Sequence, residues 1–141
     1  MELIREITVN YKSTRRKTKV CEPKTVAAEL RAMLPDNSRE HFCALYLDGA
    51  HHIVSRAVLS SGAANAAGIH PRELFQPAIL SGACAIAVGH SHPSGDCTPS
   101  PEDKAVTKRL IEAGKLLGIP ILDHVIVSDS DYYSFLEGGL L

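Results

Sequence analysis

The stretch CAIAVGHSHPSGDCTPSPED, residues 84–103, contains a strand, a turn and the start of a helix, in that order. Cys84–Val88 is an apolar run of the kind that forms a buried strand. Pro93–Pro99 consists of turn-forming residues, and Ser100 followed by Pro101 is a typical helix start. The stretch therefore predicts a chain that leaves a buried strand, turns over its end and enters a helix.

Two histidines and an aspartate lie on the two sides of this turn. His90 and His92 project from one face, because side chains alternate along a strand. Asp103 falls in the first helical turn and faces back toward the strand end. Three ligands of N, N and O type leave the fourth tetrahedral position open, as in catalytic rather than structural zinc sites. We therefore predict one zinc ion per chain, bound by His90, His92 and Asp103.

The same helix start also fits a capping box, which explains two of these residues without a metal. In a capping box the Ser100 side chain accepts from the amide of Asp103, and the acid reaches back to the Ser100 amide. The capping and metal-binding interpretations are compatible, because they use different atoms.

A zinc site that activates water also needs a general base outside the ligand set. Glu40 is the candidate, since it opens an apolar run to Asp48 that predicts a central strand beside the histidine strand. The alternative for Glu40 is an exposed acid at a strand start.

These residues resemble the JAMM motif of the JAB/MPN metalloprotein family. That motif is a glutamate on an early strand, then His-x-His, seven residues, Ser, two residues and Asp, and the spacing from the histidines to the aspartate is met here. The similarity is stronger to the RadC branch, and it runs from residue 40 to the C-terminus. The residues that carry it are Glu40–Phe42, Leu47–Asp48, Gly62, Asn65, His70–Glu73, His90–Asp96, Pro99–Ser100, Asp103 and Leu122–His124.

The resemblance implies a hydrolase that cleaves peptide or isopeptide bonds by attack of a zinc-bound water. In this interpretation Glu40 takes a proton from the water and delivers it to the leaving amine. Ser100 stabilises the tetrahedral oxyanion, a contribution of about 3 kcal/mol for one such donor in other enzymes. A peptide or a protein conjugate is the expected substrate.

The resemblance also implies an α/β fold of the JAB/MPN, cytidine-deaminase-like type, with a mixed sheet flanked by helices. Interleaved strand and helix patterns favour the same class. We predict one domain over residues 1–141, with an N-terminal strand pair and helix in 1–35 and the metal-site core in 36–141. The predicted strands are Ile4–Tyr11, Thr18–Cys21, Phe42–Leu47, Ile53–Leu59, Cys84–Val88 and Ile121–Val127, and the helices are Val26–Met33, Arg72–Leu80 and Pro101–Leu117, before a short tail around Tyr132–Leu136.

Two features near the motif have more than one interpretation. Asp123 and His124 lie within an apolar strand, where they form either a structural hydrogen-bonded pair or a partner that orients a ligand imidazole. Cys97 lies in the turn between His92 and Asp103, where a passive loop residue and a thiolate close to the metal are the alternatives.

Composition limits the remaining function classes. The 141 residues are 45% hydrophobic, enough for the core of one domain. The formal net charge of −1 predicts no strong field for nucleic acid. A basic cluster of Lys12, Arg15–Lys17 and Lys19 is expected to be a solvated hairpin turn, with contact to phosphates as the alternative. Four cysteines without a C-x-x-C pair and no apolar stretch long enough to span a membrane predict a reduced, cytoplasmic protein.

Other functions are less favoured by the sequence. The first alternative is a RadC-like module associated with DNA repair or with protein binding, with little or no catalytic activity. Longer RadC proteins carry a helix-hairpin-helix region ahead of this domain, and the chain has no room for one, which weakens an inference to DNA binding. A nucleobase deaminase is disfavoured, because its His-x-Glu and Pro-Cys-x-x-Cys signature is absent.

Overall fold

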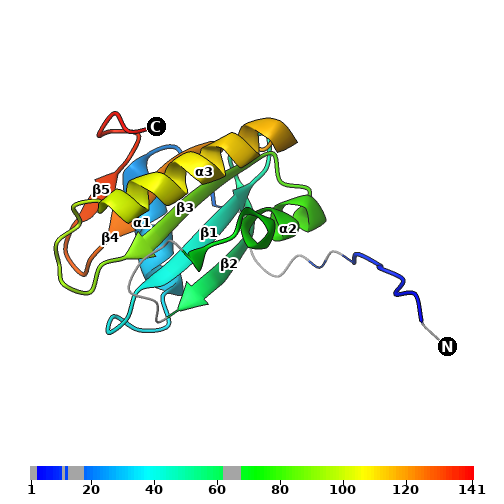
Figure 1. Cartoon of the computed structure of the whole chain (residues 1–141), viewed down its shortest axis with the longest axis horizontal. Coiled ribbons are helices and arrows are strands. Elements are labelled where there is room, and N and C mark those ends of the chain that lie inside the picture. The colour runs from blue at the N-terminus through cyan, green and yellow to red at the C-terminus, as the bar shows by residue number, and fades with distance from the viewer. Residues whose placement is uncertain (1–2, 11, 13–17, 62–67) are drawn as a thin grey trace.

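Five strands form one open mixed sheet in the order β2-β1-β3-β4-β5 (Figure 1). The computed structural model describes residues 3–10, 12, 18–61 and 68–141. The strands are β1 (His41–Leu47), β2 (Ile53–Ser61), β3 (Ala85–Ser91), β4 (Ile121–Val127) and β5 (Tyr132–Ser134). β1 pairs antiparallel with β2 and β3, β3 pairs parallel with β4, and β4 pairs antiparallel with β5.

Three helices cover the two faces of this sheet. Helix α1 (Pro23–Met33) packs on one face, and α2 (Pro71–Ser81) and α3 (Pro101–Leu117) pack on the other (Figure 1). β1 is buried along its whole length because it contributes to both layers. Phe42, Ala44 and Tyr46 belong to the α2/α3 layer, while the alternate residues belong to the α1 layer. The predicted α/β class with a mixed sheet between helices is confirmed.

The boundaries of most elements agree with the sequence patterns to within a few residues. One difference lies at the histidine strand, which begins at Ala85 and reaches Ser91, so that Cys84 precedes it and is exposed. All four cysteines are free. No helix in the described ranges combines the length and the apolar character needed to cross a membrane.

The predicted N-terminal strand pair is wrong for the residues that the structure describes. Residues 3–10 lie in no strand, and the side chains of Leu3, Ile4 and Ile7 are exposed. The segment around Lys19 pairs with the start of β2 instead, through an antiparallel bridge to His52. The main-chain groups of residues 18–20 therefore form their hydrogen bonds with residues 51–53. The apolar residues of 3–10 contribute nothing to the core. The cluster Arg15–Lys17 lies outside the described residues.

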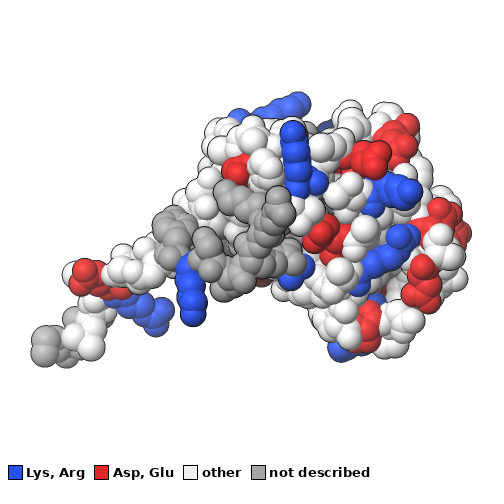
Figure 2. Space-filling view, turned by 180° about the vertical axis from the view of Figure 1, so that it is seen from behind, with Lys and Arg blue, Asp and Glu red and all other residues white. Residues whose placement is uncertain are grey.

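Charged side chains of both signs are intermixed over the described residues of the face seen in Figure 2. This distribution agrees with the near-zero net charge of the chain.

Close packing of α1 on the sheet depends on Gly89 in β3. A Cβ atom at this position would lie 2.1 Å from Leu30 Cδ1 and 2.6 Å from the backbone oxygen of Val125. The contact to Leu30 brings α1 against the strand that carries His90. The contact to Val125 involves a main-chain atom of the neighbouring strand, which cannot shift without disturbing the sheet. The helix and the sheet can approach this closely only because residue 89 has no side chain.

We expect Gly89→Ala to lower the free energy of unfolding by about 1–3 kcal/mol, because the added methyl overpacks this contact. Urea unfolding followed by circular dichroism measures the change. Gly49→Ala is the matched control, since its added Cβ would have Cys84 Sγ as nearest neighbour at 4.0 Å. Equal effects of the two substitutions would contradict the packing argument.

Candidate metal centre

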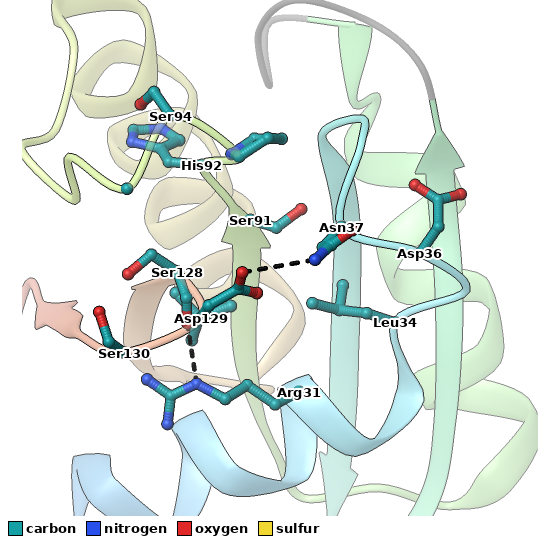
Figure 3. Close-up of a pocket in the computed structure, with 13 residues that line it drawn as sticks. Arg31, Leu34, Asp36, Asn37, Ser91, His92, Ser94, Ser128, Asp129 and Ser130 are labelled. Carbon is teal, nitrogen blue, oxygen red and sulfur yellow. Dashed lines mark hydrogen bonds between the residues drawn. The ribbon is translucent and has the colours of Figure 1, made fainter.

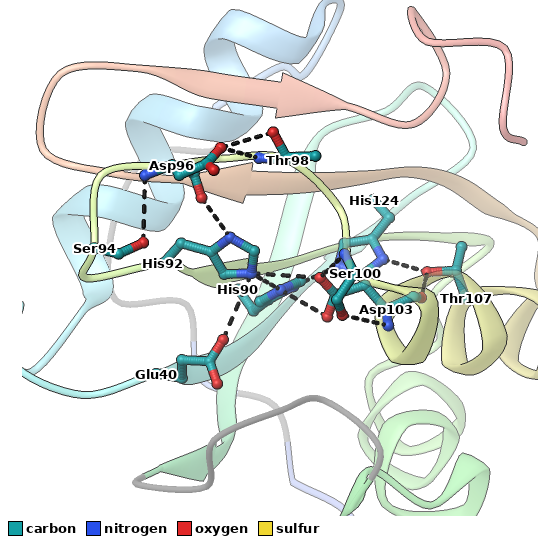
Figure 4. Close-up of polar contacts among 10 residues, drawn as sticks. All are labelled: Glu40, His90, His92, Ser94, Asp96, Thr98, Ser100, Asp103, Thr107 and His124. Carbon is teal, nitrogen blue, oxygen red and sulfur yellow. Dashed lines mark hydrogen bonds and ion pairs between the residues drawn. The ribbon is translucent and has the colours of Figure 1, made fainter.

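Three elements end or begin at one point on the α2/α3 side of the sheet (Figure 4). His90 lies near the end of β3 and His92 follows that strand directly. Phe42 of β1 is the register partner of His90, so Glu40, two residues earlier on the antiparallel chain, comes level with His92. Asp103 lies in the first turn of α3.

The polar atoms of these four side chains converge. The two imidazole Nε2 atoms of His90 and His92 are 2.9 Å apart. Asp103 places Oδ1 3.1 Å from His90 Nε2 and Oδ2 3.4 Å from His92 Nε2. Glu40 Oε1 lies 3.5 Å from His92 Nε2, and Glu40, His90 and His92 each offer a ligand atom within 4.8 Å of the others. Glu40, His90 and His92 together could hold a metal ion, so Glu40, predicted as the base, lies within ligand reach along with Asp103.

The separations fit a small tetrahedral ion. Bonds of 2.0–2.1 Å to nitrogen and oxygen ligands give edges of about 3.3 Å between ligand atoms. The contact between His90 and His92 measures 2.9 Å, and Asp103 lies 3.1 Å from His90 through Oδ1 and 3.4 Å from His92 through Oδ2, so each contact falls near the length of such an edge, although the two Asp103 contacts use different oxygens. Two imidazoles and a carboxylate are also the donor types that zinc prefers at sites with an open position.

Hydrogen bonds to residues outside the cluster indicate which ring nitrogens of the neutral histidines carry a proton, and this arrangement leaves the other nitrogens able to bind a cation. His92 Nδ1 donates to the backbone oxygen of Asp96 over 2.8 Å, which leaves the Nε2 lone pair free. His90 Nδ1 lies 2.7 Å from His124 Nε2, and donation in this direction frees His90 Nε2 as well. Both Nε2 lone pairs then face the same point, which a bound cation would satisfy.

Donation from His90 requires that His124 be neutral and protonated on Nδ1. His124 Nδ1 donates to Thr107 Oγ1, and this hydroxyl donates to the backbone oxygen of Asp103 over 2.7 Å. His124 is fully buried, and burial, together with the charge of His90, lowers the pKa of its imidazole well below the ordinary value. A continuous chain of hydrogen bonds thus links the His90 ring on β3 to the main chain of Asp103 on α3.

Asp103 also caps α3, as the sequence allowed. Its amide donates to Ser100 Oγ over 3.1 Å, and Asp103 Oδ2 accepts from the Ser100 amide over 2.9 Å, which completes the capping box. Burial alone would raise the pKa of Asp103, but when His90 and His92 are protonated on Nε2 as well as Nδ1, their hydrogen bonds to this carboxylate outweigh burial and hold the pKa below its usual range. The cap therefore presents an ionised carboxylate to both imidazoles.

Ser91 fixes the main chain on either side of Glu40. Its hydroxyl accepts from the His41 amide over 3.0 Å and donates to the Arg39 carbonyl oxygen over 3.3 Å. Ser91 stands between the two histidines of the cluster, so one side chain connects the backbone of Glu40 to the backbone of His90 and His92. The residue types around the motif gave no signal of this contact.

The structure also shows the contacts of Asp123, His124 and Cys97, for which the sequence left two interpretations open. Asp123 accepts hydrogen bonds from Ser134 Oγ and from the amides of His124 and Leu136, so its contacts are structural. His124 points to the other face and orients His90. Cys97 is buried in a small apolar cluster with Ile126 and Phe135, which favours the passive interpretation. Sequence patterns did not single out Thr107, which has the spacing of an ordinary buried helix residue.

The comparisons with known proteins agree with this geometry. Residues 20–140 match the family described as the RadC-like JAB domain. A UPF0758 protein of Methanosarcina acetivorans is 44% identical over 125 residues, which are 89% of this chain and 55% of that protein. A UPF0758 protein of Trichlorobacter lovleyi is 49% identical over 108 residues, 77% of this chain and 47% of that protein. The chain thus spans about half the length of these curated relatives.

We expect Thr107→Val to weaken the binding of added zinc by about 10–100-fold, because it cuts the hydrogen-bond chain between His124 and Asp103. Competition with a chromophoric chelator measures the affinity, and circular dichroism confirms the fold. Thr107→Ser keeps the hydroxyl and should bind zinc almost as the unsubstituted chain does. Equal affinity of the valine and serine variants would show that the hydroxyl does not support the centre.

We expect the stability that His92 contributes to the metal-free chain to fall as pH rises. The hydrogen bond to Asp103 raises the pKa of His92 above its ordinary value of 6.5. A raised pKa in the folded state means that its stabilisation is complete below the ordinary value and is lost as pH rises through the folded-state value. The difference in unfolding free energy between the chain and His92→Gln, measured with urea and a chelator, should therefore shrink as pH rises above 6.5. A difference that grows over this interval would contradict the assignment, and His51→Gln in an exposed turn is the control.

Proposed function

This chain belongs to the RadC-like JAB domain family, and from that premise we propose that it is a zinc-dependent hydrolase of peptide or isopeptide bonds. The observation that carries the proposal is the convergence of His90, His92 and Asp103 on one point, with Glu40 beside them. His90, His92 and Asp103 would hold the ion. A bound zinc ion supplies a Lewis acid and lowers the pKa of water toward neutrality.

Asp103 and Glu40 are both acidic but differ in how firmly they are held. Both oxygens of Asp103 are fixed, one facing His90 and the other bonded to the Ser100 amide. Glu40 Oε2 is buried and has no hydrogen-bond partner among the described residues. A fixed carboxylate suits a ligand, whereas a carboxylate with a free oxygen suits a group that receives and releases a proton.

The environment of Glu40 also suits a general base. Burial raises the pKa of this carboxyl; the charges of His90 and His92 act against burial, and the charge of Asp103 adds to it. A carboxylate with a raised pKa accepts a proton more readily and can then deliver it to a leaving amine. We assign both transfers to Glu40.

Ser100 can serve the substrate and the helix cap together. Its Oγ accepts a hydrogen bond from the Asp103 amide through a lone pair, so the cap does not use the hydroxyl hydrogen. We assign this hydrogen to the oxygen of the tetrahedral intermediate, where one such donor contributes about 3 kcal/mol.

We expect Glu40→Gln to keep zinc but to lower the rate of hydrolysis by about 10²–10⁴-fold, because it removes the proton acceptor. Metal analysis of the purified protein gives the zinc content, and a panel of quenched fluorescent peptides and isopeptides gives the rate. His92→Ala should lose zinc. Glu102→Gln, an exposed acid in the same helical turn as Asp103, is the matched control for Glu40→Gln.

Two results would refute the hydrolase. The first is a purified chain whose zinc content is negligible and does not change in His92→Ala. The second is a rate that Glu40→Gln leaves unaltered, which would instead favour a module that binds its partner without catalysis.

A further inference from the structure

A pocket of about 480 Å³ opens beside His92 (Figure 3). The end of α1, the loop after β3 and the turn between β4 and β5 line it. It lies at the carboxyl ends of β3 and β4, the parallel pair of the sheet, where α/β proteins commonly bind ligands. His92 is part of its wall, so a ligand in this pocket would lie against one residue of the candidate metal centre.

Arg31 of α1 brings a positive charge to the pocket. Its Nε donates to the Ser128 carbonyl oxygen over 2.9 Å, and its Nη2 donates to the Asp131 carbonyl oxygen over 2.7 Å. Both acceptors are neutral, so they hold the guanidinium in place without cancelling its charge. Its Nη1 has no hydrogen-bond partner among the described residues, and none of them brings a carboxylate within ion-pair distance of the guanidinium.

The pocket also contains two acidic side chains, Asp36 and Asp129, and neither forms an ion pair with Arg31. Asp36 pairs with His41 over 3.2 Å and also bonds to Ser38 and Arg39, and these contacts hold the pKa of Asp36 below its usual range. Asp129 Oδ2 accepts from Asn37 Nδ2 over 3.4 Å. Arg31 therefore has donors to spare for a ligand, with Asp129 as the nearby charge that competes with an anion.

We propose that this pocket is a substrate subsite in which Arg31 binds a carboxylate. A guanidinium held by neutral carbonyls, with donors left over, is suited to such a group because its planar fork matches the two carboxylate oxygens. The carboxylate belongs to an acidic side chain of a peptide or to a free C-terminus, two sources with the same chemistry. As a statement about substrates this inference rests on the proposed function, whereas the binding itself does not require hydrolysis.

The test uses capped alanine pentapeptides as probes, titrated into the full chain loaded with zinc and followed by nuclear magnetic resonance shifts. One pair of probes differs by Glu or Gln at the centre, and a second pair differs by a free or an amidated C-terminus. We expect the charged member of at least one pair to bind roughly five- to tenfold more tightly, as a charge-assisted hydrogen bond to Arg31 would give. The pair that shows the preference identifies the source of the carboxylate.

Two substitutions should move this preference in opposite directions. Arg31→Ala should abolish the preference, and Asp129→Asn should increase it. Asp129→Asn should increase the affinity for the charged probe because it removes the competing carboxylate and keeps an acceptor for Asn37. Arg109→Ala, on the exposed face of α3, is the control and should leave the preference unchanged. A gain in affinity cannot come from a damaged fold, so Asp129→Asn separates recognition from stability.

The proposal is overturned if the two members of each pair bind with equal affinity, if the preference survives Arg31→Ala, or if Asp129→Asn does not increase the affinity for the charged probe. These results are distinct from those that bear on catalysis. A carboxylate preference in a chain that Glu40→Gln shows not to be a hydrolase would sustain the subsite alone, while hydrolysis without the preference would refute the subsite alone.

Discussion

The hydrogen bond between His90 Nδ1 and His124 Nε2 is the interaction on which the centre depends, because it determines which nitrogen of His90 faces the cluster. It has this effect only while His124 is neutral, since a protonated imidazole has no acceptor. The neutral form is maintained by burial and by the flanking rings of Phe42 and Phe135, the latter stacked on His124 with ring centroids 4.5 Å apart. The apolar surroundings of a residue that does not itself belong to the cluster therefore control the donor atoms that the cluster offers.

Strand register supplies the second constraint. Phe42 faces His90 across β1 and β3, and this pairing brings Glu40 level with His92. A slip of one residue would turn every side chain of β1 to the opposite face and carry Glu40 away from the histidines. Because β1 is buried on both faces, such a slip would also bury the wrong side chains in both layers of the core.

The sequence was sufficient to predict those parts of the centre whose residues lie close together in the chain. The strand, the turn and the capped helix of residues 84–103 are specified by short-range patterns, and their spacing was enough to predict that His90, His92 and Asp103 meet. Glu40 was a candidate because it opens the apolar run of a predicted strand, but only the family resemblance supported its place beside the histidines, because no local pattern gives the distance between residues 40 and 90. The roles of these residues as ligands and base stay predictions.

The parts that could not be predicted depend on contacts across the fold. Thr107 has the spacing of a core residue of α3, and its bond to His124 exists only because β4 packs beneath that helix. The pair Asp123 and His124 was ambiguous because neighbours on a strand point to opposite faces, and only the sheet shows which neighbour meets which layer. The N-terminal prediction failed for a similar reason, since the pairing of Lys19 with His52 was not visible in the apolar pattern of residues 3–10.

The dual use of Asp103 has an evolutionary consequence. Replacing this residue removes half of a capping box along with a charged partner of the buried His90 and the half-buried His92, so the folded chain resists its loss. Glu40, by contrast, has an oxygen without a partner among the described residues, and burial disfavours its charged form, so its replacement costs the fold little. Under the proposed hydrolase function, a descendant that abandoned turnover would therefore lose Glu40 first and keep the histidine and aspartate cluster, so its structure would give little sign of the lost activity.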